Sequence, residues 1–152
     1  MATFFCNKYI MTQNSQIFTH STGSYSFEYS ENHTITEGGG IKKDVFISQS
    51  NNKEELIKID IEYSPNYIPN LQEKGQHNDT LKIDTQKIGS HNVVITHYDG
   101  LGTTYTIPVD GATNPSEFIV LSVLNKDSGD LVNSIIGTLK INLDKISLQT
   151  EL

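Results

Sequence analysis

Residues 117–124, with the sequence Glu-Phe-Ile-Val-Leu-Ser-Val-Leu, constrain the fold more than any other stretch of the chain. Successive side chains of a strand point to opposite faces of the sheet, and here both alternating sets are largely apolar. A strand of this kind must be covered on both faces, because neither set of side chains is suited to water. We therefore expect residues 117–124 to lie in the middle of a sheet within a layered domain.

The residues that follow predict a short helix and a second strand. Residues 125–130 form a turn and a helix start, with Asp127 or Ser128 as the expected cap. In the segment 130–136 the apolar residues fall on one helical face. Gly137 is expected to end this helix, and residues 139–143 resume the alternation of a strand.

Alternation of apolar and polar residues predicts further strands upstream. We expect short strands at 25–29, 33–36, 45–48, 57–63 and around 81–83, and a hairpin that joins 91–98 to 103–109 through residues 99–102. Residues 67–76 are interpreted as a loop or a short helix. The fold class is therefore α+β, with a mostly antiparallel sheet and helices packed on it.

The chain of 152 residues corresponds to one domain of ordinary size. We expect a partly ordered N-terminal arm over residues 1–22, a single domain over 23–144, and a C-terminal tail over 145–152. There is no internal repeat and no low-complexity linker. The core is thus expected to form from one continuous segment of about 120 residues.

Composition excludes several functions. The formal net charge is -7, and all eleven basic residues are lysine. A nucleic-acid-binding protein needs a surplus of cations to neutralise phosphates, so we expect no nucleic-acid partner. No apolar run approaches the roughly 20 residues that span a membrane. Cys6 is the only cysteine, so no intramolecular disulfide is possible, and its surroundings lack the pattern of a signal peptide. The compartment stays open.

Two segments stand out in this order of elements: Gly-Ser-Tyr-Ser-Phe-Glu-Tyr-Ser-Glu-Asn-His at 23–33, and Asp-Leu-Val-Asn-Ser-Ile-Ile-Gly-Thr-Leu-Lys-Ile at 130–141. They resemble the N-terminal hairpin and the final helix and strand of the Mog1/PsbP-like superfamily, and the order of elements over residues 23–143 is similar to that of the family. Ser30 and His33 depart from the family pattern, which often has proline and tryptophan there. The resemblance implies an antiparallel sheet flanked by helices on both faces, an α/β/α sandwich. It also implies a binding or assembly module, and supplies no shared active site.

Histidines are the first candidates for chemistry. His91, His97 and Asp99 share one face of a predicted strand, and two histidines with an aspartate could hold a transition metal. However, His91 and His97 lie about 20 Å apart along a strand, so they cannot share one ion. Whether His97 and Asp99 contribute to a metal site stays open. His77 and Asp79 lie in a polar loop without the spacing of a calcium-binding loop.

Other side chains give no candidate for catalysis. Cys6 has no base near it in the sequence, and there is no Gly-x-Ser-x-Gly motif. The carboxylate pair of Asp60 and Glu62 is interpreted as the solvated polar face of a strand, and His33 as a packed structural histidine. We therefore predict no catalytic, cofactor-binding or metal-binding residue and no cofactor.

The sequence favours a non-enzymatic binding or assembly module whose partner is a protein. Tyr63, Tyr67, Ile68 and Leu71 cluster around the 67–76 loop, and aromatic anchors are enriched at interfaces. Alternatively, the same residues pack this loop onto the domain. A second functional hypothesis is a small-molecule or metal-binding protein with a cleft between sheet and helix.

Overall fold

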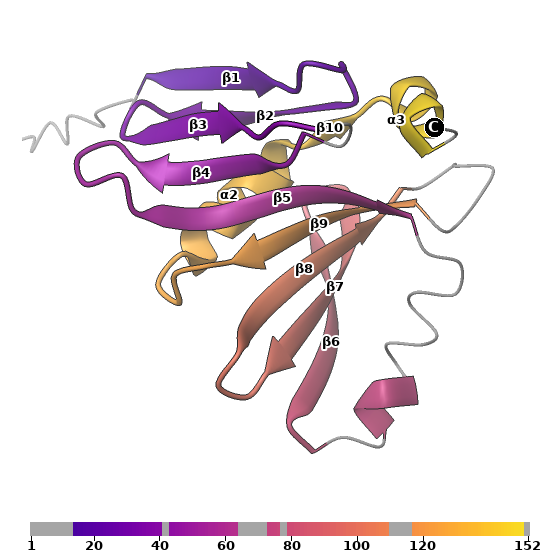
Figure 1. Ribbon diagram of the computed structural model, residues 1–152. Helices are drawn as coiled ribbons and strands as arrows, with labels where there is room; N and C mark the ends of the chain where they lie inside the picture. The colour runs from indigo at the N-terminus through magenta and orange to yellow at the C-terminus, as the bar shows by residue number, and fades with distance from the viewer. Residues whose placement is uncertain (1–13, 41–42, 64–72, 77–78, 110–116, 151–152) are drawn as a thin grey trace, which may run out of the picture.

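Antiparallel strands dominate the fold (Figure 1). The computed structural model describes residues 14–40, 43–63, 73–76, 79–109 and 117–150. The strands form one sheet of three and one sheet of seven, and all neighbouring strands in both sheets run antiparallel. This arrangement confirms the predicted α+β class with a mostly antiparallel sheet.

The smaller sheet contains residues from both ends of the described chain. Its order is β1 (Ser15–Thr19), β2 (Tyr25–Ser30) and β10 (Lys140–Ile141). The larger sheet has the order β3 (His33–Glu37), β4 (Val45–Gln49), β5 (Glu55–Tyr63), β9 (Glu117–Val123), β8 (Gly102–Pro108), β7 (His91–Tyr98) and β6 (Leu81–Ile88). The predicted hairpin is the pair β7–β8, with almost the predicted bounds.

Strand β9 occupies the central place that its apolar sequence predicts. It pairs with β5 on one side and with β8 on the other. Phe118 and Val120 are buried on one face of the sheet, and Ile119 and Leu121 are buried on the other. Burying both sets removes a large apolar area from water, which is why this strand lies inside the sheet.

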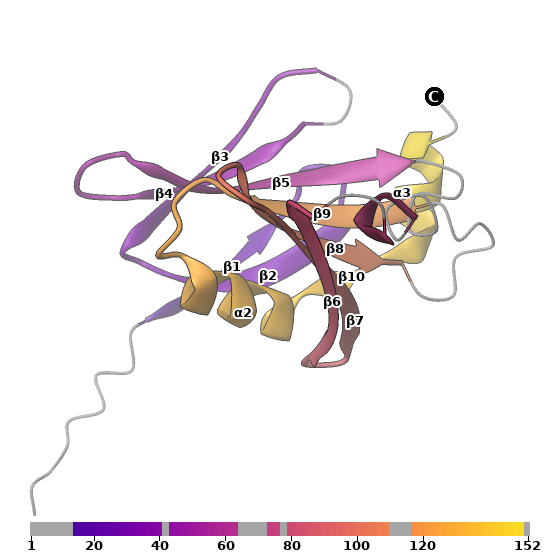
Figure 2. The same ribbon diagram turned by 90° about the horizontal axis from the view of Figure 1, so that it is seen from below.

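The main core lies between the seven-stranded sheet, helix α2 (Gly129–Thr138) and the three-stranded sheet. Val132, Ile135 and Ile136 of α2 are fully buried in it. Figure 2 shows α2 running along β1 and β2 toward β6, and it packs against β2, β6 and β9. We call this side of the large sheet the α2 face, and the other side, which carries Phe118 and Val120, the opposite face. The predicted α/β/α sandwich, in which helices flank both faces of the sheet, stays a prediction.

Helix α2 follows the predicted pattern closely. Ser128 occupies the N-cap position, where its carbonyl accepts from the Val132 amide at 3.0 Å, but its side chain makes no capping bond. The helix extends past Gly137 to Thr138, after which Leu139 is extended. A β-turn at Gly89 meets the end of this helix, because a Cβ there would lie 3.2 Å from the Cα of Gly137.

The chain ends in a helix that the sequence did not predict. Helix α3 (Leu143–Thr150) spans much of the segment expected to be a tail. The Asn142 carbonyl accepts from the amides of Lys145 and Ile146 at 3.2 and 3.1 Å, which starts the helix. Ile146 is fully buried and joins the main core. Leu143 and Ile146 are spaced three residues apart, as on one helical face, but so short a segment carries too little periodicity to predict a helix before its packing is known.

Candidate functional site

A groove with a volume of about 230 Å³ lies beside the tip of the β7–β8 hairpin. Leu101 from the hairpin turn and Leu124 from the end of β9 lie at it, together with Tyr105 and Val123. Among the described residues that line it, Lys126, from the loop between β9 and α2, is the one that carries a charge. We call this feature the Leu101–Leu124 groove.

Both leucines at the groove are open to solvent. Leu101 is 86% exposed and Leu124 is 48% exposed, and they are two of four large exposed apolar side chains in the described part of the chain. Their backbones are held in place, because the Leu101 amide donates to the Tyr98 carbonyl at 3.0 Å and the Leu124 amide donates to the Leu56 carbonyl at 2.8 Å. The groove is therefore a surface of mixed polarity at which two exposed leucines are held by an ordered backbone.

A larger hollow, lined by more charged side chains, adjoins the groove. Its volume is about 800 Å³, and it shares Gly102, Thr103 and Lys126 with the groove. Lys82, His97 and Asp99 also line it. The combined surface thus passes from apolar side chains at the hairpin tip to mixed charges along the ends of β6 and β7.

The structure separates the histidines that the sequence placed on one strand face. His91 donates from Nε2 to the Leu139 carbonyl at 2.7 Å, whereas the His97 Nδ1 lies 2.9 Å from the Thr103 hydroxyl. His91 thus ties β7 to the end of α2. His97 shares the polar hollow with Asp99 and Asp79, but the part of the chain that the structure describes holds no group of three metal-ligating side chains.

The pair of His97 and Thr103 does not form a catalytic dyad. The two residues face each other in the register of β7 and β8, and their contact is exposed. A nucleophilic hydroxyl needs a base that a third group orients, and no carboxylate contacts His97 within the described ranges. The contact is thus a cross-strand hydrogen bond of the kind that supports sheets.

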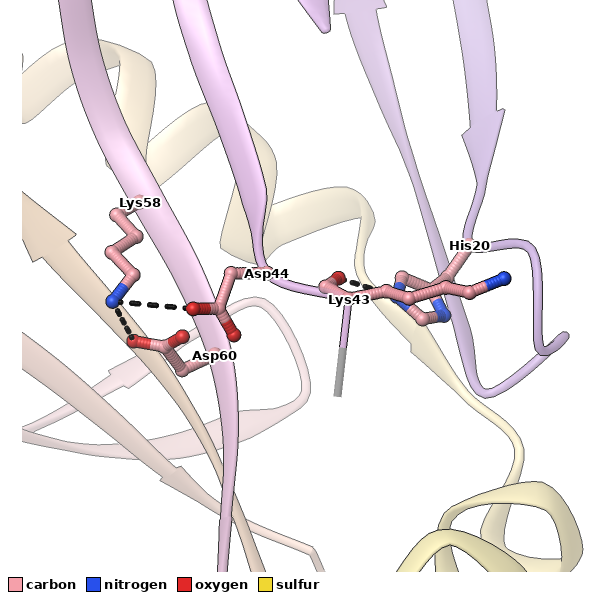
Figure 3. Close-up of polar contacts among 5 residues, drawn as sticks. All are labelled: His20, Lys43, Asp44, Lys58 and Asp60. Atoms are coloured by element: carbon pink, nitrogen blue, oxygen red, sulfur yellow. Dashed lines mark hydrogen bonds and ion pairs between the residues drawn. The ribbon is translucent and has the colours of Figure 1, made fainter. Parts of the chain in front are cut away.

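Two carboxylates and one lysine meet on the opposite face of the large sheet (Figure 3). Lys58 Nζ lies 3.4 Å from an Asp44 carboxylate oxygen and 3.3 Å from an Asp60 carboxylate oxygen. Lys58 and Asp60 come from β5, where residues two apart share a face, and Asp44 precedes β4, the neighbouring strand. Sheet register therefore brings the three groups together.

The interpretation of Asp60 as a solvated surface carboxylate is wrong. Its side chain is only 13% exposed. Burial, and then the neighbouring Asp44 carboxylate, raise the pKa of Asp60 from 3.8 to about 6, while Lys58 acts in the other direction. Burial depends on what covers the polar face of β5, which the alternation of residues within that strand does not show.

His20 lies near this cluster and has a structural role (Figure 3). It is 1% exposed, and its Nε2 lies 2.9 Å from the Lys43 carbonyl. Since a carbonyl only accepts, Nε2 carries the proton, and Nδ1 accepts from the Thr22 hydroxyl at 2.6 Å. The ring also stacks on Tyr25 at 4.9 Å. His20 therefore joins the β1–β2 turn to the segment before β4.

A third hollow, of about 290 Å³, lies between the β4–β5 region and the start of α2. His33, Glu54 and Asp127 line it. His33 is also held by the Ser30 hydroxyl at 3.0 Å, and burial lowers the pKa of its ring. The Glu54 carboxylate accepts from the Asn125 side chain at 2.7 Å. The Ser30–His33 contact lies within the β2–β3 turn, and the Glu54–Asn125 bond holds the segment before β5 to the loop before α2.

Four residues were predicted to form an interface around the 67–76 loop, and the structure describes one of them, Tyr63. Tyr63 is 46% exposed at the end of β5. Tyr67, Ile68 and Leu71 lie outside the described residues. The exposed apolar surface at the hairpin tip was missed in the sequence, although a leucine between two glycines at a hairpin turn is a recognisable signal.

Comparisons with known proteins show similarity at the level of fold. No protein-family model matches the chain, and none of the curated proteins matches it. A crystal structure from Bacteroides thetaiotaomicron is similar with a TM-score of 0.52 and 14% identity, over 84% of this chain. The chain spans about half, 48%, of that structure.

The solution structure of cyanobacterial PsbP (CyanoP) from Synechocystis is also similar, with a TM-score of 0.48 and 11% identity. The match covers 88% of this chain and 96% of that one. The PsbP-like fold that the sequence resemblance implies stays a prediction. At these identities the similarity concerns the fold alone. None of the described helices is long and apolar enough to cross a membrane.

Proposed function

We propose that this protein is a non-catalytic binding or assembly module of the PsbP-like type, and that a protein partner docks in the Leu101–Leu124 groove. The observation that carries the proposal is the pair of exposed leucines at one groove. Exposed apolar side chains gathered around a hollow are typical of interaction sites, because covering them on binding releases water.

The dimensions of the groove favour a protein side chain as its occupant. A volume of about 230 Å³ is smaller than the pockets that enclose small molecules, which range from about 300 to 1,000 Å³. It suits one or two apolar side chains from a partner whose remaining surface lies on the rim. Tyr105 adds an aromatic wall, a side chain that often contributes most at interfaces.

The charge at the groove specifies the partner further. Lys126 is the one charged side chain among the described residues that line the groove, and it also borders the adjoining polar hollow, where Lys82, Asp79 and Asp99 lie. A carboxylate beside the apolar anchor of the partner would pair with Lys126 and steer the encounter. We therefore expect the partner to present a large apolar residue next to aspartate or glutamate.

A peptide library provides a direct test. Peptides are selected from a random library on the wild-type chain alone, and the binding of the selected peptides to a Leu101→Ala, Leu124→Ala double variant is then measured. We expect the selected peptides to share a large apolar residue beside an acidic one. Loss of both leucines should weaken binding about 10- to 100-fold, as expected for anchors worth about 1 to 3 kcal/mol together.

The matched control is Ile17→Ala. Ile17 is 71% exposed but lies on β1, outside the groove. We expect this variant to bind the selected peptides as the wild type does. Peptides without a shared pattern, or equal binding by the groove variant, would contradict the proposed docking site.

The polar hollow favours one alternative, a small-molecule-binding function. His97, Asp79 and Asp99 line it, and its volume of about 800 Å³ is within the range of ligand pockets. Titration with a set of small polar molecules, monitored by NMR, distinguishes the alternatives. Saturable shifts confined to these side chains would favour the alternative over the docking module.

A further inference from the structure

Strand β6 is an edge strand with one free side. It is eight residues long, whereas the edge strands β1 and β3 have five residues each. It pairs with β7 on one side, and within the described ranges no strand pairs with its other side. Most of its side chains are exposed, including those of Lys82, Asp84 and Thr85. A long free edge presents backbone donors and acceptors to other chains.

The register shows which backbone groups face this free side. The Asp99 amide donates to the Thr80 carbonyl, so the pair formed by these residues is hydrogen-bonded, and such pairs alternate along an antiparallel ladder. Lys82 and Asp84 therefore direct their backbone groups to β7, whereas Leu81, Ile83 and Thr85 direct theirs outward. In agreement, the Thr85 amide donates to its neighbouring Asp84 carboxylate at 2.8 Å rather than to β7.

We propose that β6 is a self-association site, at which a second copy of this chain adds its own β6 in antiparallel orientation. The two-fold axis passes through Ile83, so that Ile83 faces Ile83 of the second copy. Leu81 then faces Thr85 of the second copy, and their outward backbone groups exchange hydrogen bonds. This proposal does not depend on the Leu101–Leu124 groove.

Charge complementarity selects this register. With the axis at Ile83, Lys82 faces Asp84 of the second copy, and the two-fold symmetry repeats that pair. Continuing the same register places Asp79 opposite Lys87. An axis at Asp84 would instead place two aspartates opposite each other, and an axis at Thr85 would place Lys82 opposite Ile88. Opposite charges across strands are favourable, whereas like charges directly opposite are unfavourable.

Within the described ranges, the helical turn at 73–76 packs on the first half of β6. Gly75, in the helical turn at 73–76, packs against the side chain of Ile83, where a Cβ would lie 2.7 Å from its Cδ1. Ile83 belongs to the opposite face, so this contact lies above the sheet rather than along its edge. Helix α2 meets the other end, at the β6–β7 turn. In the free chain the Asp84 carboxylate accepts from the Thr85 amide. When the second copy adds to the strand, this carboxylate becomes available to pair with Lys82 of that copy.

Charge reversal tests the register. Sedimentation equilibrium of the full chain, in a series reaching about 1 mM, should show a monomer–dimer equilibrium. Lys82→Glu alone or Asp84→Lys alone creates two like-charge pairs per dimer, so each should raise the dissociation constant about 10- to 30-fold. The double variant restores the pairs and should return the constant to about the wild-type value.

Hydrogen exchange gives a second readout that is independent of these variants. As the chain concentration rises, the amides of Leu81, Ile83 and Thr85 should become protected, whereas those of Lys82 and Asp84 should stay unchanged because β7 already accepts from them. A wild-type chain that sediments as a monomer throughout would overturn the proposal. Single variants that associate as the wild type does, or a double variant without recovery, would also overturn it.

Discussion

The buried carboxylate Asp60 makes the stability of this protein depend on pH in an unusual direction. The pKa of its side chain is about 6 in the folded chain, whereas an ordinary aspartate has a pKa of 3.8. A carboxyl group whose pKa is raised by folding stabilises the folded state while it is protonated, below its ordinary pKa. That contribution is lost as the pH rises from about 4 to 6. We expect Asp60→Asn, which cannot ionise, to remove this dependence.

The magnitude follows from the environment of the cluster. The difference between the two pKa values corresponds to about 3 kcal/mol at most. Lys58 and Asp44 are 34% and 35% exposed, so solvent screens part of the interaction. We therefore expect the asparagine variant to gain about 1 to 2 kcal/mol of unfolding free energy relative to the wild type as the pH rises from 4 to 7.

Urea unfolding at several pH values, followed by circular dichroism, measures this difference. The comparison between variants is needed because Glu37 acts in the opposite sense: burial raises the pKa of Glu37, but hydrogen bonds from Ser21 outweigh this and lower it. Glu55→Gln, at the exposed first residue of β5, is the control and should follow the wild type. A constant difference between wild type and Asp60→Asn from pH 4 to 7, or one of opposite sign, would refute the reasoning.

Two further predictions concern packing. Gly89→Ala should lower the unfolding free energy by about 1 to 3 kcal/mol, because Gly89 has a φ of +59° and a Cβ there would lie 3.2 Å from Gly137. Gly100→Ala, with a φ of +75° but no atom within 4 Å of a Cβ, should cost about 1 kcal/mol, and equal losses would exclude the contact as the cause. His20→Ala should cost about 2 to 4 kcal/mol, since it leaves a cavity and removes the bond to the Lys43 carbonyl. A loss below about 0.5 kcal/mol in urea unfolding would show that His20 does not join these segments.

Local patterns in the chain were sufficient to determine most elements of the fold. Residues 117–124 are apolar in both alternating sets, and the central place of β9 in the sheet follows from that. The hairpin β7–β8 and helix α2 follow in the same way from turn residues and periodicity. These features are encoded within a few consecutive residues, because periods of 2 and 3.6 are properties of the local backbone.

The tertiary structure alone decided the environment of individual side chains. Asp60 belongs to the polar set of β5, yet Asp44 of a different segment and the cover of the sheet raise its pKa. Helix α3 depends on the burial of Ile146, and the groove depends on Leu101 and Leu124 meeting from distant parts of the chain. Sequence alone determined that this chain forms a largely antiparallel α+β domain. The surfaces that can bind a partner depend on strand register and on burial. Both are set by contacts between distant segments, so the local periodicity of the sequence does not show them.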